Sequence, residues 1–181
     1  NISSLVLDQV HQAYVHNEQL SLDVHDQMLE LFKTYLKVGG MPKAVSTYLS
    51  SQDMLEVRNV QKAIEEGYKS KMLMHVLSKE RERFLNLHAS IPEQIAKGNM
   101  RFMYKDMDEK ATHRNYFKSI RYIYRMGWAF VVYKLKSTNF PLVENTRSES
   151  FIFMIRDVGC LSGQLSEDSV EQFSDLNLIQ H

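Results

Sequence analysis

Residues 105–132 read KDMDEKATHRNYFKSIRYIYRMGWAFVV and combine an amphipathic helix with a following strand. At about 100° per residue, four basic side chains fall within an arc of about 60° on this helix: Arg114, Lys118, Arg121 and Arg125. Tyr116, Ile120 and Ile123 lie on the opposite side and are predicted to face the core. Thr112 is a favourable N-cap residue, and Gly127 can take the positive φ that often ends a helix.

The order of helix, glycine and strand is that of the third helix and first wing strand of a winged helix-turn-helix. Residues 78–89 are the predicted first helix of this motif. Ser90 and Glu93 form an S-x-x-E capping box around Pro92, which predicts a separate second helix at residues 91–97. The other predicted elements are two wing strands and a closing helix, at residues 129–135, 151–155 and 158–165.

Helical periodicity also runs through the first half of the chain. Apolar residues recur at helical spacing in four segments: residues 5–16, 25–37, 42–49 and 53–72. Pro42 suits a first helical turn, because its missing N–H is not needed there. The sequence therefore predicts a mostly α protein, with an N-terminal helical bundle at residues 1–77, a winged helix-turn-helix with a small antiparallel β-hairpin at 78–165, and a polar, partly disordered tail at 166–181.

The composition limits the kind of protein that this chain can be. A length of 181 residues with 44% hydrophobic content allows one domain with a core, or one domain plus a helical extension. No apolar run approaches the roughly 20 residues that cross a bilayer, and no secretory signal begins the chain. We therefore expect a cytoplasmic protein with no membrane partner. Because the chain begins at Asn1 rather than Met, we also expect it to be a piece of a longer protein.

Charge is distributed unevenly along the chain. The net charge is zero, with 22 basic and 22 acidic residues. All 22 Lys and Arg residues lie between Lys33 and Arg156, together with 12 of the acidic residues, so this central part has a net charge of +10. A neutral chain therefore contains a basic central region.

A longer stretch carries a family resemblance. Residues 31–72 read LFKTYLKVGGMPKAVSTYLSSQDMLEVRNVQKAIEEGYKSKM, and the most specific part is the order Tyr35, Leu36, Gly39, Gly40, Met41 and Pro42. Three later segments contribute: SIPEQIAKGNMRFMY, the helix before Gly127, and FIFMIRDVGCLSG, which contains Asp157 and Gly159. Over residues 31–165 the chain resembles the DUF4143 domain of prokaryotic AAA-type (AAA_14-like) P-loop ATPases.

This resemblance implies a non-catalytic regulatory or interaction module that lies C-terminal to an ATPase core, its expected partner in the same protein. The chain itself holds no G-x-x-x-x-G-K-[ST] motif, so we expect it neither to bind a nucleotide cofactor nor to act as an enzyme. The residues that carry the family motif are expected to be structural: Tyr35, Gly39, Gly40, Pro42, Gly127, Asp157 and Gly159.

The basic side of the helix at residues 113–125 has three interpretations. Exposed Lys and Arg residues can neutralise phosphates without reading sequence, so this surface could hold double-stranded DNA. The same charges could meet an acidic protein surface, or simply face solvent. His113 and Asn115, near the helix start, are the candidates for direct contacts to bases. DUF4143 relatives usually carry acidic residues at the positions of Lys118, Arg121 and Arg125, which weakens the nucleic-acid interpretation.

No metal site or catalytic constellation is predicted. His11 and His16 are five residues apart and diverge by about 140° on a helix, and HExxH is absent. Cys160 is the single cysteine, which excludes an internal disulfide, and it lacks the neighbouring base that a nucleophile requires. Two classes of function remain: a regulatory or interaction module, and a nucleic-acid-binding winged helix.

Overall fold

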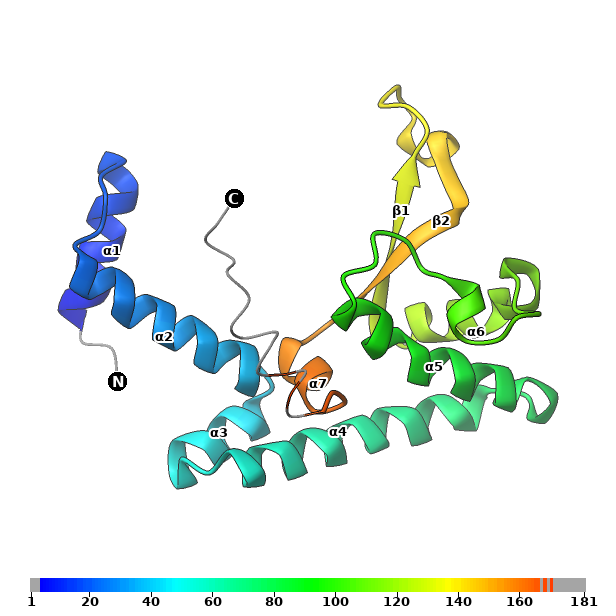
Figure 1. Ribbon diagram of the computed structural model, residues 1–181, viewed down its shortest axis with the longest axis horizontal. Coiled ribbons are helices and arrows are strands. Elements are labelled where there is room, and N and C mark those ends of the chain that lie inside the picture. The colour runs from blue at the N-terminus through cyan, green and yellow to red at the C-terminus, as the bar shows by residue number, and fades with distance from the viewer. Residues whose placement is uncertain (1–3, 167, 169, 171–181) are drawn as a thin grey trace.

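A computed structural model describes residues 4–166, 168 and 170. This part of the chain forms seven α-helices and one two-stranded antiparallel sheet (Figure 1). The helices are α1 (Ser4–His16), α2 (Leu22–Val38), α3 (Pro42–Ser51), α4 (Met54–His75), α5 (Arg81–Ala96), α6 (His113–Arg125) and α7 (Val158–Ser162). The strands and 3-10 helices are β1 (Ala129–Leu135), β2 (Thr146–Ile155), η1 (Ser78–Glu80), η2 (Tyr104–Asp106) and η3 (Leu142–Asn145). The predicted mostly α fold with a small antiparallel hairpin is confirmed.

The N-terminal helices extend to one side of the molecule (Figure 1). α3 packs against α4, and α2 packs against α7. Val38, Ala44 and Val57 form a small core where α2, α3 and α4 meet. No described residue of α1 is buried, so α1 extends from this bundle and adds nothing to its core.

The longest helix, α4, contributes to both halves of the fold. It begins at a capped end, where Asp53 Oδ1 accepts a hydrogen bond from the Leu55 N–H at 2.7 Å. Its buried residues Val57, Gln61, Glu65 and Met72 lie on one side of the helix. Val57 belongs to the small core, whereas Met72 belongs to the main core. α4 therefore connects the helical bundle to the region of α5, α6 and the hairpin.

The main core lies between α5, α6 and the hairpin. Its buried residues are Met72, Val76, Phe84, Leu87, Ile91, Phe102, Ala111, Tyr116, Ile120, Ile123, Trp128, Ala129, Phe151 and Phe153. The Phe102 N–H donates to the Phe151 C=O at 2.8 Å, so the segment before η2 lies beside β2. Two full helices, α5 and α6, therefore precede the hairpin, and the short 3-10 helix η2 lies between them.

The predicted break between two helices at Ser90 is wrong. α5 is one continuous helix that contains Pro92. Ser90 is buried within it, and its Oγ donates to the Leu87 C=O at 3.0 Å instead of capping a new helix. Phe84, Leu87 and Ile91 on the same side of α5 pack into the main core. Their burial outweighs the roughly 3 kcal/mol that a proline costs inside a helix.

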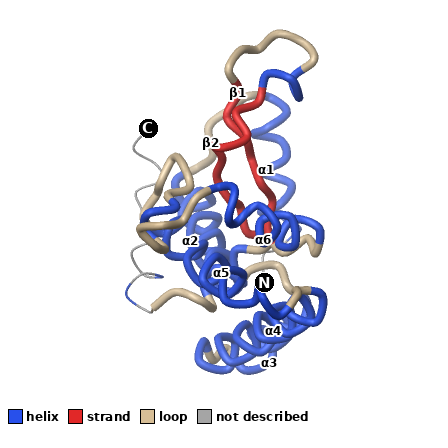
Figure 2. The backbone as a smooth tube through the Cα atoms, turned by 90° about the vertical axis from the view of Figure 1, so that its right-hand side faces the viewer, coloured by secondary structure: helices blue, strands red, loops and turns tan. Residues whose placement is uncertain are grey.

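The hairpin is longer than predicted. β1 and β2 pair antiparallel, with Ala129 opposite Ile155, and β2 begins at Thr146 instead of residue 151. Phe151 and Phe153 join the main core, which anchors the base of the hairpin. The loop that connects the two strands lies far from the helices of the core (Figure 2).

The C-terminal region agrees with the prediction only in part. α7 ends at Ser162, earlier than the predicted end at residue 165. The predicted polar tail at residues 166–181 lies mostly outside the described residues. Val170, which is described, is buried against Leu161 and Leu165. None of the helices described here is both long enough and apolar enough to span a membrane.

Candidate functional site

Helix α6 presents a row of basic side chains to solvent. This basic face consists of Arg114, Lys118, Arg121 and Arg125, all of which are exposed. On the opposite side, Tyr116, Ile120 and Ile123 are 3%, 3% and 0% exposed. The Thr112 hydroxyl accepts a hydrogen bond from the Asn115 N–H at 3.3 Å, so the helix begins where the sequence predicts. The predicted separation of a charged side from a core side is confirmed.

Little acidic charge neutralises the basic face. Lys118 Nζ lies 3.8 Å from Glu80 Oε1, and the Arg121 guanidinium lies 5.6 Å from the centroid of the Phe117 ring. Among the described residues, no ion pair involves the three arginines of this face. An arginine stacked on an aromatic ring keeps its hydrogen-bond donors for another partner. Most of the charge of the basic face is therefore available to a ligand.

The two residues predicted to contact bases have different surroundings. His113 is partly buried, and its Nδ1 lies 2.9 Å from the Tyr104 hydroxyl. Its ring also contacts the rings of Phe117 and Phe151, so the imidazole is held against the core. Asn115 is exposed and lies beside the start of the basic face.

The hairpin adds positive charge to this end of the molecule. Between His113 and Arg156 the chain carries eight Lys or Arg residues and two Glu residues. Lys134, Lys136 and Arg147 are exposed on or beside the two strands. α6 and the hairpin both lie on the side of the molecule opposite α1 and α2 (Figure 1). This side therefore carries an excess of positive charge.

Asp157 ties α7 to the end of α2. Its Oδ2 accepts from the Gly40 N–H at 2.7 Å, and its Oδ1 accepts from the Cys160 N–H at 3.1 Å. One carboxylate thus caps α7 and holds the turn after α2. Gly39 in that turn has a φ of 76°, a conformation that glycine adopts without a steric penalty.

The other residues expected to be structural serve this junction or the end of α6. A Cβ atom on Gly159 would overlap the Val38 C=O, so α7 approaches α2 closely because glycine stands there. Pro42 occupies the first turn of α3, and Tyr35 is 48% exposed near the end of α2. Gly127 follows α6 with a φ of 65°. Local backbone geometry accounts for Pro42 and Gly127, whereas Gly159 is required by the contact between α7 and α2.

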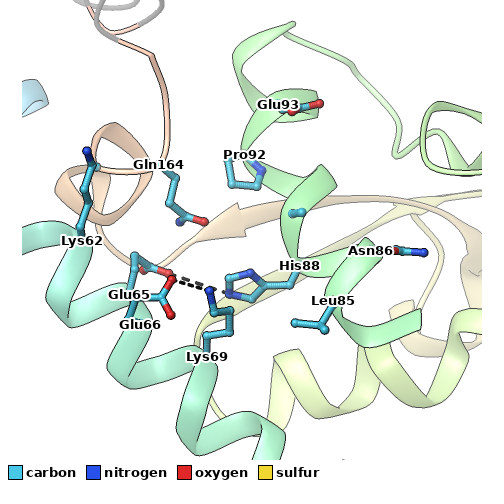
Figure 3. Close-up of a pocket in the computed structure, with 12 residues that line it drawn as sticks. Lys62, Glu65, Glu66, Lys69, Leu85, Asn86, His88, Pro92, Glu93 and Gln164 are labelled. Carbon is cyan, nitrogen blue, oxygen red and sulfur yellow. Dashed lines mark hydrogen bonds and ion pairs between the residues drawn. The ribbon is translucent and has the colours of Figure 1, made fainter. Parts of the chain in front are cut away.

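A cavity of about 550 Å³ between α4 and α5 was not predicted from the sequence (Figure 3). α4 contributes Glu65 and Lys69, α5 contributes Asn86 and His88, and Gln164 lines the cavity from beyond the end of α7. The described residues contain no group of three His, Cys, Asp or Glu side chains that could hold a metal ion.

Glu65 and His88 form the buried side of the cavity, and they are 5% and 6% exposed. His88 Nε2 lies 3.9 Å from Glu65 Oε2, which is too far for a hydrogen bond. The Trp128 indole N–H donates to both oxygens of Glu65, at 3.1 and 2.9 Å. The His88 ring stacks on Trp128 with 4.2 Å between the ring centroids.

Burial shifts the pKa values of Glu65 and His88 in opposite directions. Loss of water raises the pKa of Glu65 from 4.5 to about 6, against the smaller opposing effect of hydrogen bonds from Trp128 and Cys160. Loss of water lowers the pKa of His88 from 6.5 to about 4, and the charge of Lys69 adds to this effect. At neutral pH the carboxylate is therefore mostly charged and the imidazole is neutral.

The helical spacing of the sequence places Glu65 and His88 in buried rows. Glu65 follows Val57 and Gln61 at intervals of four residues on the buried side of α4, and His88 follows Phe84 at the same interval on α5. Charged residues are rarely fully buried unless they are paired, so a glutamate in a buried row indicates a special environment. That the two rows meet depends on the packing of α4 beside α5, which spacing alone does not show.

A family model described as a domain of unknown function, DUF8612, matches residues 29–171. The chain belongs to the DUF8612 family. The DUF8612 match runs from within α2 to beyond α7, and it includes the basic face, the Asp157 junction and the cavity. No curated protein and no solved structure matches the chain at a significant level.

The resemblance to DUF4143 is wrong, because the matching family model is that of DUF8612. The motif around Gly39, Gly40 and Pro42 describes a positive-φ turn followed by a helix that starts with proline. Helices joined by such a turn generally favour glycine and proline at these positions, so the motif by itself does not identify a family. The expected AAA-type ATPase parent followed from the DUF4143 resemblance, so it is no longer supported.

Proposed function

We propose that this DUF8612 chain is a non-catalytic binding module that holds the phosphate backbone of double-stranded nucleic acid through α6 and the hairpin. The basic face carries the proposal. Its four cations are exposed on one side of one helix, and Glu80 is the one acidic residue among the described residues that pairs with them. Exposed Lys and Arg side chains in such a row are the usual ligands of nucleic-acid phosphates.

The dimensions of α6 suit a groove of duplex DNA. A rise of about 1.5 Å per residue spreads the interval from Arg114 to Arg125 over roughly 16 Å. A major groove about 12 Å wide admits an α-helix, so cations along the helix can reach the phosphates at the groove edges. Lys134 and Lys136 on the exposed hairpin offer further contacts to the same backbone.

This contact is expected to depend weakly on base sequence. Lys and Arg contacts to phosphates position a protein on DNA without carrying sequence information. His113 is engaged by the Tyr104 hydroxyl, which leaves Asn115 as the exposed polar residue for a base contact near the start of α6. We therefore expect similar affinities for duplexes of different sequence.

An acidic protein surface is the second candidate ligand for the basic face. Phe117 and Tyr124 are 45% and 58% exposed on α6, and they lie beside its arginines. Exposed aromatic residues together with arginine are typical anchors of protein interfaces. A contact of that kind buries apolar rings, so its affinity falls less steeply with salt than a contact made to phosphates.

Binding of the chain to a random-sequence DNA duplex, followed by fluorescence anisotropy over a salt series, tests the proposal. Each neutralised phosphate changes the slope of log K against log salt by about −0.9, so four cations predict a slope of about −3 to −4. Absence of binding at low salt would overturn the nucleic-acid proposal. A slope near zero would instead indicate contacts that are not made to phosphates.

A further inference from the structure

The cavity between α4 and α5 is a second place where this chain can bind a ligand, and it is separate from the basic face of α6. Its volume of about 550 Å³ falls within the range of about 300–1,000 Å³ that is usual for small-molecule sites. Its lining combines charged, amide and apolar side chains. Most of the lining residues are polar or charged, and Leu85, Ala89 and Pro92 add apolar surface.

One polar atom on the buried side of this cavity lacks a partner. His88 is 6% exposed, and its Nε2 has no hydrogen-bond partner among the described residues. The Glu65 carboxylate faces it, with Oε2 at 3.9 Å. A nearby carboxylate favours the neutral tautomer that carries its hydrogen on Nε2. A donor and an acceptor therefore face each other without a direct hydrogen bond.

A hydroxyl group has the chemistry that this pair of atoms requires. Its oxygen can accept from His88 Nε2 while its hydrogen is donated to Glu65 Oε2. An ammonium group has no lone pair to accept the imidazole hydrogen. The lining carries three glutamates, Glu65, Glu66 and Glu93, against the two lysines Lys62 and Lys69, so its charge is unfavourable for a carboxylate or a phosphate. We propose that the cavity binds a small polyhydroxylated ligand, a polyol or sugar, with one hydroxyl bridging His88 Nε2 and Glu65 Oε2.

The rest of the lining suits the other groups of such a ligand. Asn86 and Glu93 line the cavity from α5, and their amide and carboxylate provide both donors and acceptors for further hydroxyls. Pro92 and Leu85 provide apolar surface for the C–H groups of the ligand. Figure 3 shows His88 and Leu85 pointing from α5 toward the lysines and glutamates of α4, with Asn86 and Glu93 farther from α4.

Lys69 lines the cavity beside His88. Its side chain reaches from α4 toward the His88 ring (Figure 3) and pairs with Glu66. The side chains of this pair are 30% and 65% exposed, and exposed ion pairs hold their side chains weakly. Lys69 can therefore move aside to let a hydroxyl reach His88.

Trp128 provides a reporter for the experiment, because it is the single tryptophan of the chain and contacts both Glu65 and His88. The full chain is titrated with glycerol, ribose, glucose and myo-inositol, and with ethylamine and inorganic phosphate as controls without the required hydroxyl chemistry. Tryptophan fluorescence and calorimetry read each titration. We expect a saturable response to at least one polyol or sugar, and none to ethylamine or phosphate.

Variants assign the response to the cavity. His88→Phe keeps a ring against Trp128 but removes Nε2, and should weaken binding about tenfold, as expected for one lost hydrogen bond. Asn86→Ala, at an exposed position, should also weaken binding and serves if His88→Phe fails to fold. Arg121→Glu on the basic face should bind the polyol or sugar as the wild type does. The proposal is overturned if no polyol or sugar binds, if ethylamine or phosphate binds instead, or if both cavity variants bind as the wild type does.

Discussion

The Trp128 indole N–H donates to both carboxylate oxygens of Glu65, at 3.1 and 2.9 Å, although 63 residues separate the two in sequence. Trp128 lies between α6 and β1, whereas Glu65 lies within α4. Both residues are buried. A buried carboxylate is stable when donors replace the water that it has lost. This contact therefore joins α4 to the hairpin region and sets the environment of the cavity at the same time.

Replacement of Trp128 by Phe should destabilise the fold mainly through Glu65. The change leaves a buried carboxylate without its indole donor, which costs about 1–3 kcal/mol, in addition to the smaller loss of packing. In a Glu65→Leu background there is no charge to leave unpaired, so the same substitution should cost much less. A double-mutant cycle measured by urea denaturation, with circular dichroism as the signal, gives the coupling energy. Equal costs in both backgrounds would show that the hydrogen bond contributes nothing.

Glu65 should also make stability depend on pH. Its pKa is about 6 in the folded chain against an ordinary 4.5, so the folded state binds a proton that the unfolded state has released. Stability from this group is fully present below about pH 4.5 and is lost as the pH rises through 6, by about 2 kcal/mol at 1.36 kcal/mol per pKa unit. Glu65→Gln cannot ionise. The free energy of unfolding of Glu65→Gln relative to wild type should therefore increase by about 2 kcal/mol as the pH rises from 4.5 to neutral.

His88 makes the stability of the fold depend on pH in the opposite direction. Its pKa is about 4 in the folded chain against an ordinary 6.5, so its contribution is fully present above about pH 6.5 and is lost as the pH falls through 4. Between about pH 4.5 and 6 the effects of Glu65 and His88 cancel in the wild type. Glu65→Gln leaves the effect of His88 unopposed. Urea denaturation at several pH values checks this, and parallel curves for wild type and variant would contradict it.

The junction between α2 and α7 should be intolerant of any side chain at Gly159. A Cβ atom there would overlap the Val38 C=O and approach the Gly39 Cα to 2.9 Å, both of which belong to the backbone and cannot turn aside. Gly159→Ala should cost roughly 2–4 kcal/mol. Gly67→Ala is the matched control, because a Cβ atom at Gly67 meets nothing within 4 Å and alanine favours a helix interior by about 0.5–1 kcal/mol. Thermal melting should separate the two variants in opposite directions.

Features that depend on neighbouring residues could be predicted from the sequence. Thr112 caps α6 and Gly127 follows it at positive φ, since both roles depend on local backbone geometry. Tyr116 and Ile123 are buried as helical spacing predicts. The periodicity of Val57 likewise places α4 correctly. The positions of α4 and α6 and the inner side of α6 therefore followed from the sequence.

Features that depend on contacts between distant segments could not be predicted. Pro92 suggested a helix start, yet tertiary packing of Phe84 and Ile91 keeps α5 continuous through it. The cavity requires Glu65 and His88 to approach across two helices, which no local pattern specifies. The motif at residues 39–42 was misleading for the opposite reason, since its local geometry is common to many helix junctions.

The basic face yields the most direct test of function, through Arg121→Glu. Arg121 is exposed and stacks on Phe117, an interaction worth about 0.5–1 kcal/mol, so the variant should fold with nearly wild-type stability. At a phosphate contact the new carboxylate removes one attraction and adds a repulsion. We expect duplex affinity to fall by tenfold or more at low salt, and the slope of log K against log salt to become shallower by about 1. Fluorescence anisotropy measures both quantities.

Two further variants serve as controls for Arg121→Glu. Lys43→Glu on α3 alters the net charge by the same amount at an exposed residue outside α6, so it should reduce affinity far less if the contact is local. Ile123→Ala should show the reverse pattern, because Ile123 is 0% exposed and truncation of a buried isoleucine costs about 2–5 kcal/mol. Equal losses of affinity in Arg121→Glu and Lys43→Glu would mean that DNA responds to net charge alone. A marked fall in the melting temperature of Arg121→Glu without any change in binding would place Arg121 among the packing residues, and the ligand of this chain would then have to be sought away from α6.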